Sequence, residues 1–213
     1  MKQHSFSWAL FEKAPIVGII RHVSLEDLKH ILPIYREAGL TTIEITMNTP
    51  HAEKMIQYAL KNEQNGLNIG AGTVCDKKDV KRALRAGAQF IVTPITNKKV
   101  IKSCVKKGVP IFSGAFTPTE IYKAASLGAS MVKIFPATTM GADYIKDLKA
   151  PMNHLKLLPT GGVGLDNMSA FFKAGASGFG IGGQLFDKTL IQEQDWEGLK
   201  KHFRKFTKEI DSW

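Results

Sequence analysis

A single lysine in the middle of an apolar run is the residue of this chain best suited to covalent chemistry. The run covers 130–136, with Lys133 at its centre and Pro136 at its end. Side chains of a strand alternate between its two faces, so Lys133 shares a face with Met131 and Phe135. If helices cover the sheet, burial lowers the pKa of the amine. A neutral amine attacks ketones, whereas the alternative is a lysine that reaches solvent from a strand end.

Glu44 is a carboxylic acid inside a second apolar run, between Ile43 and Ile45. Burying an acid costs free energy unless the acid has a partner. Two interpretations follow: an ion pair with Lys133 that serves packing, or a general acid/base. The position of both residues near strand ends favours the second.

The elements that must position these residues alternate short apolar runs with amphipathic stretches. A short helix over 5–13 is expected to cap the fold, and a helix over 195–206 to close its outer layer. Another helix is expected to begin at Ser24, with Asp27 three residues later. Strands are expected at 16–20, 42–46, 68–71, 90–93, 110–112, 131–134, 155–158 and 178–181.

Four glycines mark helix ends at intervals of about two strand–helix units. Gly39, Gly87, Gly128 and Gly175 each precede a strand, as glycines in the left-handed conformation do, and they lie 48, 41 and 47 residues apart. Eight strands separated by helices indicate an α/β chain folded as one (β/α)8 TIM barrel domain over 1–213. A doubly wound open sheet is the alternative, but no G-x-G-x-x-G follows the first strand.

Composition and charge narrow the possible partners. The chain has 213 residues and a net charge of +10, but its lysines fall in short clusters without interleaved aromatic residues, so we expect no nucleic-acid partner. An anionic small substrate would be attracted by this charge. No apolar run suits a membrane span or a secretory signal, and Cys75 and Cys104 are expected to be free thiols, so a cytoplasmic location is expected.

Polar residues and glycines gather where the strands of this barrel are expected to end, which is where TIM barrels carry their active sites. Two glycine pairs follow the seventh and eighth strands, where backbone N–H groups of such barrels often bind phosphate, although tight turns alone would also explain them. The residues at strand ends are Arg21, Glu44, Asn48, Thr73, Pro94, Lys133, Thr160, Gly161, Gly162, Gly182 and Gly183.

An amine, a carboxylic acid, a cation with hydroxyls and a phosphate site together indicate a Schiff-base aldolase acting on a 2-keto acid. No metal or cofactor is expected, since His22 is the only one of six histidines near a strand end. Two alternatives stay open. One is a sugar-phosphate isomerase or epimerase on the same barrel, and the other is a basic barrel that binds nucleic acid or a protein without catalysis.

Five motifs then resemble one family, in order and over essentially the whole chain. They are Ile-Glu-Ile-Thr at 43–46, Gly-Ala-Gly-Thr-Val at 70–74, Thr-Pro at 93–94, Val-Lys-Ile-Phe-Pro-Ala at 132–137 and Pro-Thr-Gly-Gly-Val at 159–163. This pattern resembles the 2-keto-3-deoxy-6-phosphogluconate (KDPG)/4-hydroxy-2-oxoglutarate (KHG) aldolase family.

The resemblance implies a class I aldolase, a carbon–carbon lyase, with a homotrimeric barrel. Its substrate would be a phosphorylated keto-deoxy acid, split into pyruvate and glyceraldehyde 3-phosphate as in the Entner–Doudoroff pathway. Lys133 would form the Schiff base, and Glu44 would be the general acid/base, acting through a water. Thr73, the backbone near Pro94 and a basic residue would bind the pyruvyl carboxylate.

The resemblance also implies that Gly161, Gly162, Gly182 and Gly183 bind the phosphate and that Thr160 contacts a substrate hydroxyl.

Departures from the family pattern limit this assignment. Asn48 stands where gluconate-type enzymes have an arginine, and galactonate-type relatives also have an asparagine there. The residue that binds the carboxylate is therefore either Arg21 or Asn48. Gly183 and Gln184 replace a serine that the family commonly has at or next to this turn, which removes a hydroxyl ligand. Thr160 instead looks like the gluconate type, so the preferred C4 epimer stays open.

Overall fold

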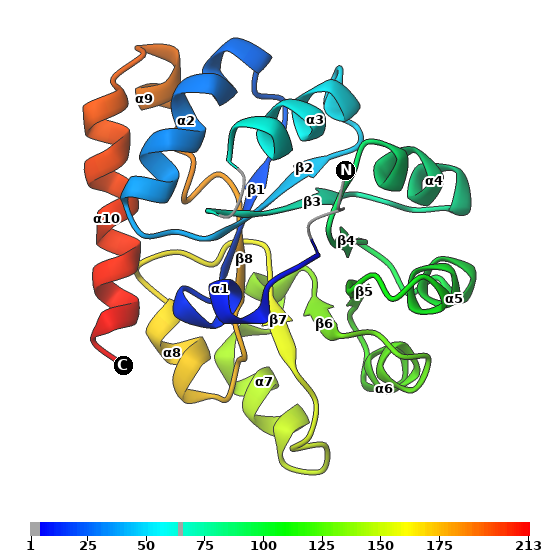
Figure 1. Cartoon of the computed structure of the whole chain (residues 1–213). Helices are drawn as coiled ribbons and strands as arrows, with labels where there is room; N and C mark the ends of the chain where they lie inside the picture. The colour runs from blue at the N-terminus through cyan, green and yellow to red at the C-terminus, as the bar shows by residue number, and fades with distance from the viewer. Residues whose placement is uncertain (1–4, 64–65) are drawn as a thin grey trace.

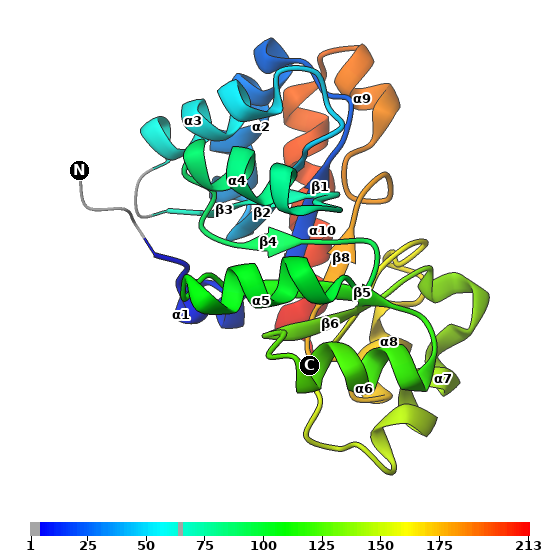
Figure 2. The same cartoon turned by 90° about the vertical axis from the view of Figure 1, so that its right-hand side faces the viewer.

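The chain forms one eight-stranded parallel sheet that curls into a barrel, with helices on the outside (Figures 1 and 2). The computed structural model describes residues 5–63 and 66–213. The strands follow the order β7-β6-β5-β4-β3-β2-β1-β8. They are β1 (Ile16–Ile20), β2 (Thr42–Thr46), β3 (Asn68–Gly72), β4 (Ile91–Val92), β5 (Ile111–Ala115), β6 (Met131–Ile134), β7 (Leu157–Pro159) and β8 (Phe179–Ile181).

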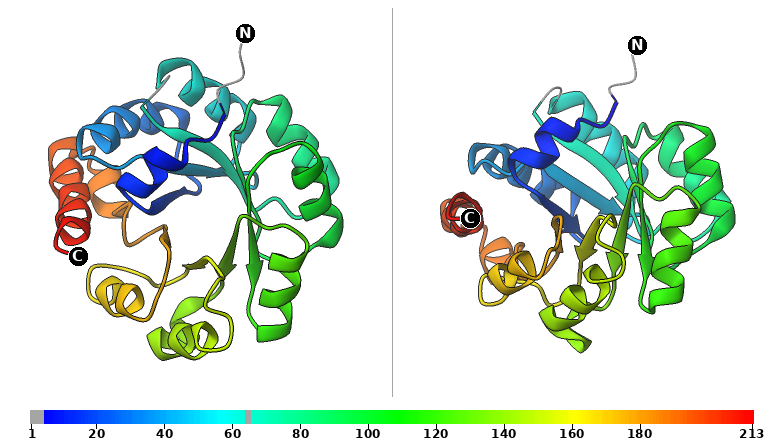
Figure 3. Two further views of the ribbon diagram at one scale, coloured as in Figure 1. Left: turned by 60° about the horizontal axis from the view of Figure 1, so that its bottom comes forward. Right: turned by 90° about the horizontal axis from the view of Figure 1, so that it is seen from below.

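The two ends of this order meet, so the sheet closes into a ring. A parallel bridge between Thr160 and Gly180 joins the end of β7 to β8, and Figure 3 shows the strands around a common axis. The expected (β/α)8 barrel is therefore confirmed. Three expected strands keep their bounds, while β4 is shorter than expected and β5 extends to Ala115.

Helices follow the strands along the outside of the ring. They are α1 (Trp8–Lys13), α2 (Leu25–Glu37), α3 (Ala52–Asn62), α4 (Lys77–Arg85), α5 (Lys98–Lys106), α6 (Pro118–Ser126), α7 (Gly141–Lys149), α8 (Met168–Lys173), α9 (Lys188–Gln192) and α10 (Trp196–Asp211), with a 3-10 turn η1 (Ala137–Thr139) before α7. Among the described residues, no helix has the length and apolar content that crossing a membrane requires.

Local sequence signals set the helix ends. Ser24 caps α2 by accepting a hydrogen bond from the N–H of Asp27, as expected. Gly39, Gly87, Gly128 and Gly175 have φ between +91° and +97°, a left-handed conformation that glycine adopts without a steric penalty. The last helix, α10, extends to Asp211, beyond the expected end at Phe206.

Aromatic side chains fill the barrel at the end where the strands begin. Phe6 and Phe11 pack against Phe90 and Phe112, and Asn68 fixes this segment by exchanging two hydrogen bonds with the backbone of Ser7, at 2.8 and 2.9 Å. The helix α1 thus caps the ring, as expected and as Figure 3 shows in blue. The floor cluster comprises Phe6, Phe11, Val17, Phe90, Val92, Phe112, Met131 and Leu158.

Candidate active site

Lys133 and Glu44 both point into the barrel, from strands on opposite sides of it. β2 and β6 are separated by three strands in the ring order. Lys133 shares a face of β6 with Met131 of the floor cluster and is 5% exposed. Glu44 is 1% exposed, and its carboxylate covers Gly72 so closely that a Cβ there would overlap Glu44 Oε1. The alternation of side chains along β2 and β6 therefore places Glu44 and Lys133 together inside the barrel.

Burial shifts the pKa of both groups toward their neutral forms. Desolvation lowers the pKa of Lys133, the charge of Glu44 opposes this shift, and Arg21 adds to it. Desolvation raises the pKa of Glu44, and the charges of Lys133 and Arg21 oppose this shift. We expect the solvation cost to prevail for both groups, since both side chains are buried.

The two groups do not neutralise each other by direct contact. They form no ion pair within 4.0 Å, and Glu44 Oε1 is a buried oxygen without a hydrogen-bond partner in the described residues. A buried acceptor of this kind loses its hydration without compensation. A water or a substrate hydroxyl between the two groups would satisfy it.

The amine of Lys133 lies 5.2 Å from the ring centroid of Phe135, on the same face of the strand. Phe135 is 38% exposed and forms part of a cavity wall. The ring therefore covers the amine on one side while the cavity leaves it accessible on another.

Arg21 and Thr73 meet at the ends of β1 and β3. Arg21 Nη2 donates a hydrogen bond to Thr73 Oγ1 at 3.3 Å. Thr73 has φ +55°, an unusual conformation for a β-branched residue and one that tends to occur at functional sites. His22, beside Arg21, has φ +55° as well. These contacts bring a cation and a hydroxyl together near the strand ends.

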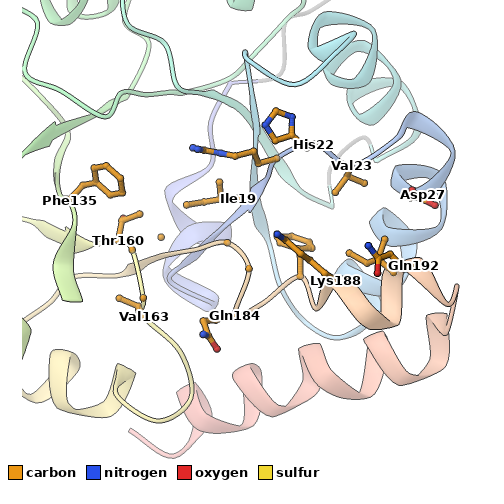
Figure 4. A pocket seen from close by; sticks show the side chains of 18 of the residues that line it. Ile19, His22, Val23, Asp27, Phe135, Thr160, Val163, Gln184, Lys188 and Gln192 are labelled. Atoms are coloured by element: carbon orange, nitrogen blue, oxygen red, sulfur yellow. The ribbon is translucent and has the colours of Figure 1, made fainter. Parts of the chain in front are cut away.

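A cavity of about 820 Å³ opens at the ends of β1, β6, β7 and β8, where TIM barrels bind their substrates (Figure 4). Its size suits a small metabolite. The wall consists of Ile19, Arg21, His22, Val23, Asp27, Lys133, Phe135, Thr160, Gly161, Gly162, Val163, Gly180, Gly182, Gly183, Gln184, Phe186, Lys188, Ile191, Gln192 and Gln194.

Most of the residues expected at the site line this cavity, but four do not. Glu44 is buried behind the wall, and Thr73 contacts the site through Arg21. Pro94 is half-buried and outside the wall, and Asn48 is exposed on the turn after β2. Of the two alternatives for the carboxylate contact, Arg21 and Asn48, only Arg21 lines the cavity.

The two glycine turns differ in why they contain glycine. Gly161 and Gly162 have φ of +93° and +70°, so the backbone itself favours glycine at both positions. A Cβ at Gly183 would meet no atom within 4 Å, and Gly183 has no such φ. Within the described chain, the N–H groups of Gly162 and Gly183 donate no hydrogen bond to protein atoms. Both are therefore available to an anion.

The far wall of the cavity, which α2 and α9 provide, was not predicted from the sequence. Asp27, Lys188 and Gln192 lie there. The helix α9 has only five residues, too few for periodicity to reveal a buried face, and no strand precedes Lys188 directly. An available signal was Asp187, which caps α9 by accepting hydrogen bonds from the N–H groups of two following residues.

The described residues hold no group of three or more His, Cys, Asp or Glu side chains arranged to bind a metal ion.

Comparisons with known proteins agree with this geometry. A family model described as KDPG and KHG aldolase matches residues 9–202. A 2-dehydro-3-deoxy-phosphogluconate aldolase of Haemophilus influenzae is 34% identical over 200 residues, 92% of this chain and 93% of that protein. A 2-dehydro-3-deoxy-6-phosphogalactonate aldolase of Escherichia coli is 34% identical over 176 residues, 82% and 85% of the two chains. A solved structure described as native KDPGal has a TM-score of 0.88 and 30% identity, with 98% of each chain covered.

Proposed function

Because the chain belongs to the KDPG and KHG aldolase family, we propose that it is a class I aldolase that cleaves 2-keto-3-deoxy-6-phosphogluconate or its galactonate epimer to pyruvate and glyceraldehyde 3-phosphate. Cleavage of 4-hydroxy-2-oxoglutarate belongs to the same proposal. The observation that carries it is the buried Lys133 amine, whose pKa is lowered and which lines the cavity. The lowered pKa increases the share of the neutral amine, which is the nucleophile.

Lys133 opens the reaction by attacking the C2 carbonyl of the keto acid. The C–N bond forms, the carbonyl oxygen leaves as water, and an iminium remains between Lys133 and C2. The C3–C4 bond then breaks, its electron pair moves into an enamine, and C4 leaves as the aldehyde. Protonation of C3 and hydrolysis of the iminium release pyruvate and regenerate the amine.

Glu44 moves the protons in this sequence. As a carboxylate it accepts the proton of the C4 hydroxyl through a water, and as an acid it returns a proton to C3. Its raised pKa suits both roles, because general acids and bases work best with a pKa near the working pH. Glu44 forms no direct ion pair with Lys133 within 4.0 Å, which supports proton transfer through a water rather than by direct contact.

Different residues hold the two ends of the substrate. Arg21 and Thr73, with the backbone near Pro94, bind the pyruvyl carboxylate, and Asn48 is the less favoured candidate because it is exposed outside the cavity. Thr160 contacts a substrate hydroxyl. The phosphate lies on the N–H groups of the turns at Gly161, Gly162, Gly182 and Gly183.

Borohydride reduction with pyruvate tests this proposal directly. We expect a stable pyruvyl adduct on Lys133, located by mass spectrometry of peptides, and no adduct in Lys133→Ala. Cleavage assays with both phosphorylated epimers, side by side, then identify the preferred substrate. An unmodified protein that interconverts sugar phosphates would instead support the isomerase or epimerase alternative.

We also propose an oligomeric state, a cellular compartment and a pathway for the enzyme. We place the enzyme as a homotrimer in the cytoplasm, in the Entner–Doudoroff pathway, on the basis of its resemblance to the phosphogluconate aldolases. Sedimentation equilibrium tests the oligomeric state, and a mass of one chain would contradict the trimer.

A further inference from the structure

Lys188 is a cation in the cavity wall that the proposed reaction does not use. It is the first residue of α9. None of the five motifs that resemble the family includes this position. In Figure 4 the side chain of Lys188 extends from that helix into the cavity, with Thr160 to one side of it and Gln192 to the other. Its amine is therefore available to a group of the ligand that occupies the cavity.

The backbone around Lys188 is fixed by the turn after β8. The carbonyl of Gly182 accepts hydrogen bonds from the N–H groups of Leu185 and Phe186, at 2.8 and 2.9 Å, and both of these side chains are buried. Asp187 Oδ1 caps α9 by accepting from Thr189 and Leu190. Binding of a ligand by Lys188 therefore does not require this backbone to become ordered first.

The amine of Lys188 has no acidic partner within the described chain. Its neighbour Asp187 is occupied with the helix cap, and no carboxylate lies within 4.0 Å of Lys188 Nζ. Asp27, the only acid in the wall, accepts a hydrogen bond from Ser24 Oγ at 2.7 Å. Arg21 and Lys188 together outweigh Asp27, so the wall carries a net positive charge and suits an anion.

The glycine turn beside Lys188 lacks a side-chain ligand for such an anion. Gly183 faces open space, and the following residue is Gln184, so neither position offers a hydroxyl. Backbone N–H groups alone carry only partial charges, whereas a lysine supplies a full positive charge to a phosphate. Lys188 begins the helix that follows this turn, and both line the same cavity.

We propose that Lys188 binds the distal phosphate of the substrate, together with the backbone N–H groups of the glycine turns, and so makes this enzyme selective for phosphorylated keto-deoxy acids. The inference rests on the proposed aldolase function and names a specificity-determining residue within it.

The test measures kcat and KM for a phosphorylated keto-deoxy acid and for the same acid without its phosphate. In Lys188→Met we expect kcat/KM for the phosphorylated acid to fall roughly 10- to 100-fold, mainly through KM, as for loss of a charged hydrogen bond. The value for the unphosphorylated acid should stay within about threefold, because the rest of the site is intact. Lys188→Arg should retain the preference for phosphate.

Lys208→Met is the matched control, because Lys208 is exposed on α10 and its removal changes the net charge equally. Trapping of pyruvate on Lys133 shows that each variant is folded and chemically competent. If Lys188→Met keeps the wild-type ratio of the two kcat/KM values, or loses both equally, Lys188 does not bind the phosphate. Failure of the wild-type protein to trap pyruvate or cleave either acid would instead contradict the aldolase function itself.

Discussion

At the scale of single residues, the interior of the barrel lowers the pKa of Lys133 and raises the pKa of Glu44. Burial drives both shifts, and the charges of the two groups oppose them. The result brings the ammonium and the carboxylic acid closer to a common pKa, which favours proton exchange through the substrate. A buried pair that only served packing would be expected to form a direct ion pair, and Lys133 and Glu44 form none within 4.0 Å.

The lowered pKa of Lys133 predicts the pH dependence of imine formation. The neutral amine is the nucleophile, so the rate of pyruvate trapping should rise with pH and level off above a midpoint below 10.5, the ordinary lysine value. Arg21 lowers this pKa, so Arg21→Gln should move the midpoint to higher pH. The charge of Glu44 raises it, so Glu44→Gln should move the midpoint to lower pH. Single-turnover trapping at saturating pyruvate measures each midpoint, and shifts in the reverse directions would contradict this electrostatic account.

Glu44→Gln should also separate imine formation from turnover. The amide keeps the size of the side chain but cannot accept and return a proton, so we expect kcat for cleavage to fall roughly 10²- to 10⁴-fold. The adduct on Lys133 should still form under borohydride. Normal turnover by this variant would remove Glu44 from the mechanism.

At the scale of elements, the glycines of β3 make room for side chains inside the barrel. A Cβ at Gly72 would overlap the Glu44 carboxylate, whereas a Cβ at Gly70 would overlap the ring of Phe90. The carboxylate ends a flexible side chain and can move away, but the ring is packed in the floor of the barrel. In β3, Gly72 thus leaves space for the Glu44 carboxylate, and Gly70 leaves space for the ring of Phe90 in the floor cluster.

Alanine at these two glycines should therefore have different effects. Gly72→Ala should displace the acid and lower kcat at least tenfold, by analogy with small misplacements of catalytic groups, while Tm changes little. Gly70→Ala should lower Tm clearly, because overpacking costs about 1–3 kcal/mol. Thermal unfolding and steady-state kinetics of both variants test the pair. Equal losses of stability would show that the acid is as tightly packed as the ring.

Strand alternation is what made the interior predictable from sequence. It assigned Glu44 and Lys133 to inward faces, and the left-handed glycines marked where helices end. It could not place residues beyond strand ends, where loop geometry decides. Asn48 therefore stayed an alternative to Arg21 until the structure showed it exposed outside the cavity. Lys188 was missed because it begins a five-residue helix that no strand directly precedes.

At the scale of the whole molecule, the two ends of the barrel have separate tasks. Aromatic rings fill the end where the strands begin, and the cavity with its charged residues occupies the end where they finish. This division is general in TIM barrels, where conserved chemistry and stability belong to opposite faces. It predicts that the floor can be weakened without changing the chemistry of the folded protein.

Phe112→Ala provides that test. Phe112 is fully buried and contacts the rings of Phe6, Phe11 and Phe90, so its truncation should lower the free energy of unfolding by about 3–5 kcal/mol. Chemical denaturation measures the loss, and Phe112→Leu, which keeps most of the volume, should lose less. Tyr122→Ala is the control, because Tyr122 is 57% exposed and should lose about 1 kcal/mol or less. Below the unfolding transition, pyruvate trapping per folded molecule should be unchanged in all three variants, and a parallel loss of trapping would mean that the floor also positions Lys133.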